Sequence, residues 1–136
     1  MTGEKNLQQL LQKMAPKLNT GEYVFTLVHD LDSVDRNLTI AEFKEREGTT
    51  MVLERSKADA LGLHYTFVAK WITLEVHSAL EAVGLTARFS TALAEAGISC
   101  NVIAGYHHDH IFVPVQDAQK AMLALDRLAK RSTKSN

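Results

Sequence analysis

The chain has a single cysteine, and this scarcity excludes two kinds of site. Cys100 has no cysteine partner, so neither an intramolecular disulfide nor a zinc site built on a Cys-x-x-Cys pair can form within one chain. Alternation places Cys100 with Ile98 and Val102 on the apolar side of a predicted strand. A free cysteine is commonly a small buried hydrophobe, so we interpret Cys100 as a packing residue and not as a nucleophile.

A membrane-spanning run and an excess of one charge are also missing. No apolar run approaches the roughly 20 residues that a membrane helix needs, and residues 1–6 lack the apolar core of a signal peptide. Fifteen basic side chains face 16 acidic ones, so no overall field draws the chain toward nucleic acid or an acidic membrane surface. We expect a cytoplasmic protein with no nucleic-acid partner and no membrane partner.

Catalytic motifs are absent as well. The chain has no glycine-rich phosphate loop and no nucleophile elbow. Glu42, Glu45 and Glu47 fall in a charged hairpin and are typical of a solvated face rather than of an acid/base pair. Four cations follow a helical pattern near the C-terminus, where they suit the negative end of the helix dipole: Arg127, Lys130, Arg131 and Lys134. We therefore expect no enzymatic activity and no cofactor.

The composition that remains is that of an ordinary globular protein, with 46% hydrophobic and 23% charged residues over 136 positions. This length suffices for one compact domain or for two small units that share a core. In the first half, periodicity and turn residues predict one helix and then strands. The expected elements are a helix from Leu7 through Met14 that ends before Pro16, a strand over 23–29, a polar loop over 30–37, a hairpin of 39–46 and 50–54 turned near Gly48, and a short helix capped by Ser56 and closed by Gly62.

From residue 65 onward the pattern is β, α, β, β, α. Its expected elements are a long strand over 65–76, a helix with an apolar face from Leu85 to Ala96 that Gly97 ends, strands over 98–104 and 110–115, and a helix over 118–129. This order is most of a ferredoxin-like α+β unit, an antiparallel sheet with helices on one face. The element order of the first half looks like a degraded copy of the same plan. We place the boundaries at residues 1–63, 64–131 and a frayed tail of 132–136.

The junction over 78–86 is the first candidate binding site. A strand passes into a helix there, and the first N–H groups of a helix lack internal partners at the positive end of its dipole, so they can hold a carboxylate. Gly84 would let a ligand approach closely. The alternative is that Gly84 only makes the turn.

The sequence around this junction resembles the ACT-domain signature, in which a loop glycine begins a helix and a Gly-Ile-x-x-Asn segment leads into the next strand. Residues 84–102 carry the glycine, the helix and Gly97-Ile98-Ser99-Cys100-Asn101. Residues 103–114 are similar to a narrower group, the short bacterial stand-alone ACT proteins of uncharacterised function, and to the ACT units of CASTOR-type arginine sensors. The resemblance is specific over 75–115, suggestive over 23–63, and leaves the first helix outside. It implies a ferredoxin-like ACT sandwich with one complete C-terminal unit and a degenerate N-terminal half.

The same resemblance implies a regulatory protein that binds a small molecule, an amino acid above all, where two ACT-like units meet. The implied ligand-binding residues are Ser78, Val83, Gly84, Leu85 and Thr86 in the loop, with Asn101, Ile103, Ala104 and Gly105 in the strand. Asp109 would suit a ligand ammonium or guanidinium group, because a carboxylate pairs well with either. ACT units often regulate a catalytic domain on the same chain, whereas we expect no enzyme within these 136 residues.

Two further groups of residues have competing interpretations. The run His107-His108-Asp109-His110 could ligate a metal, but neighbours in a strand point to opposite faces, so we favour a polar hairpin tip and predict no metal. Tyr65, Phe67 and Trp71 could line a pocket, yet burial in a core or a dimer contact is favoured. The leading hypothesis is thus an amino-acid sensor. The alternative is a non-catalytic interaction module that forms a homodimer or docks on a separate enzyme or transporter.

Overall fold

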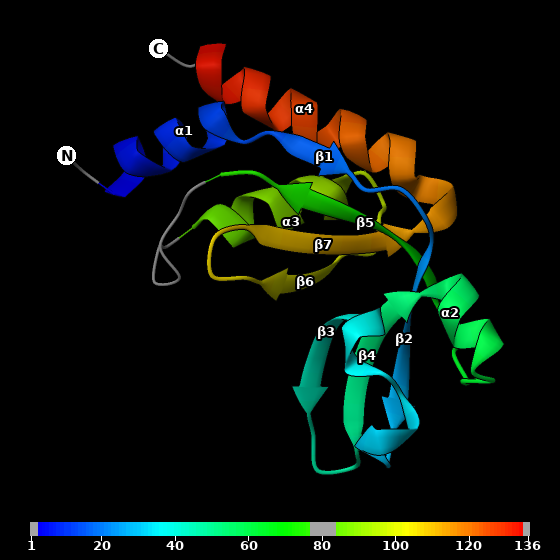
Figure 1. Cartoon of the computed structure of the whole chain (residues 1–136). Coiled ribbons are helices and arrows are strands. Elements are labelled where there is room, and N and C mark those ends of the chain that lie inside the picture. The colour runs from blue at the N-terminus through cyan, green and yellow to red at the C-terminus, as the bar shows by residue number, and fades with distance from the viewer. Residues whose placement is uncertain (1–2, 77–83, 135–136) are drawn as a thin grey trace. The chain divides into compact units, whose positions relative to one another are not determined.

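A computed structural model describes residues 3–76 and 84–134 of the chain (Figure 1). The α+β class is confirmed, and the strands of residues 16–18, 23–28, 39–44, 49–54 and 101–104 each pair antiparallel with a neighbouring strand. The elements are α1 (Gly3–Lys13), β1 (Pro16–Leu18), β2 (Tyr23–Val28), β3 (Thr39–Lys44), β4 (Thr49–Glu54), α2 (Arg55–Ala60), β5 (Val68–Leu74), α3 (Leu85–Glu95), β6 (Asn101–Ala104), β7 (Asp109–Pro114) and α4 (Ala118–Lys134), with short 3-10 turns at Leu31–Ser33, Arg36–Leu38 and Val115–Asp117.

The β, α, β, β, α order of the second half is confirmed, although several boundaries differ from those predicted. The strand predicted from residue 65 begins only at Val68, and the strand predicted from Ile98 begins at Asn101. The reason for the second difference lies at the end of α3, where the N–H of Ile98 donates to the carbonyl of Leu93 at 2.9 Å. An N–H that closes a helix cannot also join a sheet.

The chain divides into two compact units, and the boundary at residues 63 and 64 stays a prediction. Unit 1 contains residues 1–19 and 71–136, and unit 2 contains residues 20–70. The N-terminal segment joins unit 1 because β1 pairs with β5, with Pro16 opposite Leu74 and Leu18 opposite Ile72. The sequence did not predict β1, since three residues are too few to show alternation.

Unit 1 has the strand order β1-β5-β7-β6, with its helices on one face of the sheet. In Figure 1, α1 and α4 run side by side over the sheet. The buried core between the helices and the sheet consists of Leu11, Met14, Ile72, Leu74, Val76, Leu85, Phe89, Leu93, Ile98, Ile111, Val113, Ala121, Leu125 and Leu128. Each large apolar side chain buried in this way contributes about 1.5–3 kcal/mol, so α1 is an integral part of unit 1.

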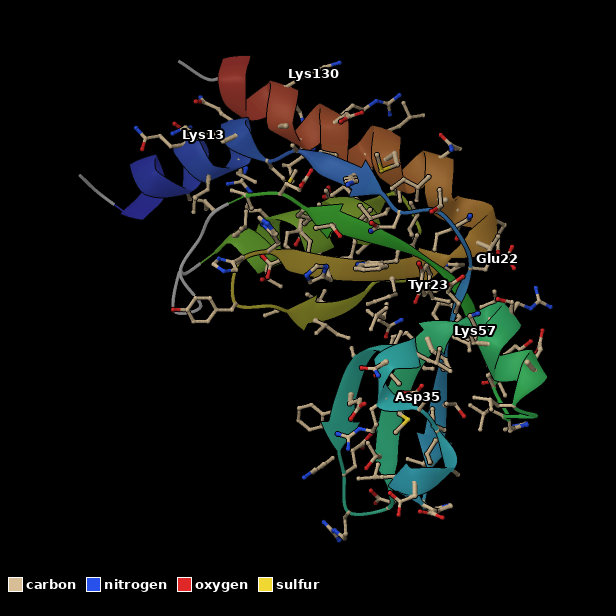
Figure 2. All side chains as sticks on the ribbon, viewed as in Figure 1. Lys13, Glu22, Tyr23, Asp35, Lys57 and Lys130 are labelled. Atoms are coloured by element: carbon tan, nitrogen blue, oxygen red, sulfur yellow. The ribbon has the colours of Figure 1, made fainter. Side chains whose placement is uncertain are left out.

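Unit 2 has the strand order β3-β4-β2 followed by the first residues of β5. Helix α2 covers one face, where Ala58 packs with Val24 and Leu53. The predicted polar loop contains two 3-10 turns, and Asp35, labelled in Figure 2, accepts a 3.0 Å hydrogen bond from the N–H of Asn37. The prediction that Ser56 caps α2 was wrong, because the helix already begins at Arg55 and has no side-chain cap.

Within the described ranges, no helix is both long enough and apolar enough to cross a membrane.

Candidate functional site

The start of α3 depends on Gly84, which has a φ of 100°. A residue with a Cβ rarely adopts this left-handed conformation. A Cβ at Gly84 would also lie 3.0 Å from Leu7 Cδ2. Gly84 has no side chain that could cap α3, so the N–H groups of the first helical turn are left to other partners. Two implied ligand residues, Ser78 and Val83, lie outside the described residues.

The two implied ligand residues that follow Gly84 differ in what they can offer. Leu85 is 3% exposed, and its side chain belongs to the core of unit 1. Only its backbone could therefore contact a ligand. Thr86 is exposed, so its side chain can reach a ligand in solvent.

The remaining implied residues lie together in the hairpin of β6 and β7. Ile103 is opposite His110, and Ala104 is opposite Asp109. Asn101, opposite Phe112 in the same ladder, has an exposed side chain. Figure 1 shows that the turn between these strands lies at the same end of the unit 1 sheet as the start of α3.

Gly105 allows this hairpin to turn tightly. Its N–H donates to the carbonyl of His108 at 2.9 Å. A Cβ at position 105 would lie 2.9 Å from that carbonyl oxygen and 3.2 Å from His110 Nε2. The backbone approach therefore requires glycine, which gives Gly105 a structural reason independent of any ligand.

Asp109 is half-buried at the start of β7. Burial raises the pKa of its carboxyl, while the neighbouring His110 lowers it to a smaller degree. Asp109 has no salt bridge among the described residues. A carboxylate that is partly desolvated and lacks a cation is suited to accept a cationic group from outside the unit.

A polar network that sequence reasoning missed lies beside this hairpin, on the sheet face away from the helices. Trp71 Nε1 donates to His110 Nδ1 at 3.0 Å, and Thr73 Oγ1 lies 3.2 Å from the same nitrogen. Asn19 Nδ2 donates to Thr73 Oγ1 at 3.0 Å and to the carbonyl of Trp71 at 3.2 Å. The indole ring of Trp71 also stacks on Phe112.

This network fixes the protonation state of His110. An indole N–H can only donate, so His110 Nδ1 must be unprotonated and the ring proton must sit on Nε2. Burial lowers the pKa of His110, His108 lowers it further, and Asp109 partly opposes them. The sequence offered one weak signal for this network, namely the polar Thr73 within an apolar strand.

The structure gives no support to a metal centre or a cysteine nucleophile. Across the described parts of the chain, no three His, Cys, Asp or Glu side chains come close enough to hold a metal ion. Burial raises the pKa of Cys100 to about 11, so its thiolate is scarce near neutral pH.

The sequence of the chain matches models of a known protein family. One ACT-domain model matches residues 2–70 and a second matches residues 67–127. The chain belongs to the ACT-domain family. The first match takes in α1, which the sequence resemblance left outside. ACT domains are ligand-binding regulatory modules of enzymes of amino-acid metabolism, and they are generally non-catalytic.

Solved structures agree with this assignment. VC0802 from Vibrio cholerae, a protein of unknown function and possible transport protein, is 53% identical, with a TM-score of 0.84 over 94% of this chain and 99% of that one. Atu0741 from Agrobacterium tumefaciens is 15% identical, with a TM-score of 0.66 over 85% of this chain and 89% of its own.

The ligand-free regulatory subunit of aspartate kinase from Thermus thermophilus is 8% identical, with a TM-score of 0.62 over 83% of this chain and 95% of its own. At such identities these two similarities concern the fold alone. No curated protein has a significant sequence match to the chain.

Proposed function

We propose that this ACT-domain protein is a regulatory sensor that binds an amino acid at the end of unit 1 where α3 begins and the β6–β7 hairpin turns. The observation that carries the proposal is the opposite electrostatic character of two groups there. The start of α3 presents N–H groups at the positive end of the helix dipole, which suits a carboxylate. Asp109 presents a carboxylate that has no salt bridge among the described residues, which suits an ammonium group.

These two anchors match the two charges that every free amino acid carries. The exposed Thr86 could add a hydrogen bond, whereas Asn101 pairs with Phe112 and so lies on the opposite face of the sheet from Asp109. The similarity to aspartate kinase regulatory subunits supports the proposal at the level of the fold. Regulation would follow by linkage, because a ligand shifts a conformational equilibrium by its difference in affinity for the two states.

Thermal unfolding in the presence of each amino acid at millimolar concentration tests the proposal. A ligand present at about 100 times its dissociation constant stabilises the folded state by about 2.7 kcal/mol, which corresponds to several degrees in Tm. Stabilisation by one amino acid or a few related ones is expected. The proposal is wrong if no amino acid raises the Tm.

Asp109→Asn separates binding at this site from general stabilisation. The variant should lose most of the ligand-induced rise in Tm, because the amide cannot form an ion pair with an ammonium group. Burial raises the pKa of Asp109 and so disfavours its charged form. Without ligand, the variant should therefore be as stable as the parent at neutral pH or slightly more stable. The gain should be less than about 1 kcal/mol, because the site is half-exposed. Asp126→Asn on the exposed side of α4 is the matched control and should leave ligand binding unchanged.

A second candidate function is a non-catalytic interaction module. Two strands favour it, because each has one edge without a neighbouring strand among the described residues. Strands β3 and β6 end the sheet order among the described strands. Exposed edges are templates for pairing with another chain. Sedimentation of the purified protein tests this candidate, since a monomer at micromolar concentration would argue against self-association.

A further inference from the structure

A groove of about 520 Å³ lies between α3 and α4 on the surface of unit 1. Three half-buried alanines form its apolar floor, namely Ala92 and Ala96 of α3 and Ala124 of α4. The larger core residues Leu93 and Leu125 hold the two helices together, whereas the short alanine side chains leave the space beside this contact open. The volume falls within the range of small-molecule sites, about 300–1,000 Å³.

The rim of this groove is basic. Arg127, Lys130 and Arg131 of α4 line it with exposed side chains, and Lys130 is labelled in Figure 2. Their spacing of three and four residues places them on one face of the helix. None of the three has a salt bridge among the described residues. Against these cations stands the carboxylate of Glu95, at the end of α3.

The helix dipole explains these cations only in part. Its effect is confined to about the last turn of a helix, and α4 ends at Lys134. Arg131 lies at the start of that turn, whereas Arg127 and Lys130 precede it. Like charges three or four residues apart on a helix also repel each other and destabilise it. An anion bound from outside would remove this repulsion.

We propose that the groove binds a small phosphorylated molecule, whose phosphate contacts Arg127, Lys130 and Arg131 and whose organic part lies on the alanine floor. A phosphate monoester carries a charge of about −1.5 to −2 at neutral pH and offers three acceptor oxygens, so it matches this set of cations better than a single carboxylate does. An arginine can bind two phosphate oxygens at once, while a lysine acts as a point charge. The alkyl stems of these side chains extend the apolar surface of the floor.

The groove is separate from the proposed amino-acid site. That site lies at the start of α3, whereas Glu95 and Ala96 lie at the other end of this 11-residue helix, roughly 15 Å away. The phosphorylated molecule would therefore be a second ligand, and its binding does not depend on the amino-acid proposal.

Isothermal titration calorimetry of the full chain in a phosphate-free buffer tests the proposal with three probes. Phenyl phosphate has both parts of the proposed ligand, inorganic phosphate lacks the apolar part, and benzoate replaces the phosphate with a carboxylate. Phenyl phosphate should bind about tenfold more tightly than either of the others, because it alone uses both the cations and the floor. The proposal is overturned if phenyl phosphate does not bind at millimolar concentration or binds no more tightly than the other two probes.

Substitutions in the groove test its location. Arg127→Gln should weaken the binding of phenyl phosphate about tenfold, because it removes charge-assisted hydrogen bonds. Glu95→Gln should tighten binding severalfold, because it removes the one negative charge beside the phosphate. Lys120→Gln is the matched control, since it removes a cation from an exposed position of the same helix outside the groove, and it should bind like the parent. Circular dichroism checks that each variant keeps the fold.

The location would be overturned by unchanged affinity in Arg127→Gln or by weaker binding in Glu95→Gln. An equal loss of affinity in Lys120→Gln and Arg127→Gln would also overturn it, because binding would then depend on net charge and not on the groove. The amino-acid screen uses different ligands, so its failure and the failure of phenyl phosphate to bind are separate outcomes.

Discussion

The hydrogen bond from Trp71 to His110 leads to a quantitative prediction about the free energy of unfolding. In His110→Leu the ring acceptor is lost, while Trp71 Nε1 and the hydroxyl of Thr73 keep their need for a partner. A donor left unsatisfied in a buried place costs about 1–3 kcal/mol. Thr73 is buried, but Trp71 is half-exposed and can recruit water, so we expect a loss near the lower end for each, about 2 kcal/mol in total.

Urea denaturation followed by tryptophan fluorescence measures this loss, because Trp71 is the only tryptophan in the chain. The emission of folded His110→Leu should also differ from that of the parent, since the indole N–H changes partner. His107→Leu, at an exposed position of the turn between β6 and β7, should lose far less stability. The reasoning about the network would be refuted by an unchanged midpoint and an unchanged emission spectrum in His110→Leu.

Three more predictions concern the same unit. Burial lowers the folded-state pKa of His110, so its neutral form stabilises the fold above about pH 6.5, the pKa of an unfolded histidine. This contribution should disappear as the pH falls through the lowered pKa. Fluorescence-monitored urea unfolding from pH 7.5 to 5 should show the loss of stability in the parent and not in His110→Leu. Gly105→Ala should cost about 1–3 kcal/mol, because its Cβ would meet the carbonyl of His108 at 2.9 Å, and calorimetry measures the drop in Tm. Leu11→Ala should cost about 2–5 kcal/mol, as expected for a fully buried leucine, and an exposed leucine such as Leu123 provides the control; a negligible cost would show that α1 does not belong to the core of unit 1.

The order of elements after residue 65 could be predicted because each is long enough to show its period. Helices α3 and α4 repeat apolar residues every three or four positions, and β7 presents Ile111 and Val113 to the same core as they do. The first and last residues of each element were harder to predict from the sequence. Whether Ile98 belongs to a strand depends on the hydrogen bond that its N–H makes with Leu93, and no pattern of side chains contains that information.

The candidate ligand site was predictable only in part. Gly84, Gly97 and Asn101 stand at spacings that resemble a family signature, and the structure places the start of α3 and the β6–β7 turn at one end of the unit 1 sheet. The role of Leu85 could not be read from spacing, because its side chain faces the core. Asn19 and Thr73 were missed because they meet His110 across strands that are remote in sequence.

The sequence by itself determined the α+β class, the β, α, β, β, α order of the second half and the family resemblance, since these depend on local periodicity and short motifs. Only the tertiary structure decided which segments form one unit. Strand β1 has three residues and no recognisable pattern, yet it completes the sheet of unit 1 by pairing with β5, far along the chain. Such a choice depends on which open sheet edge and which apolar face remain to be covered, and these exist only once the rest of the chain has folded.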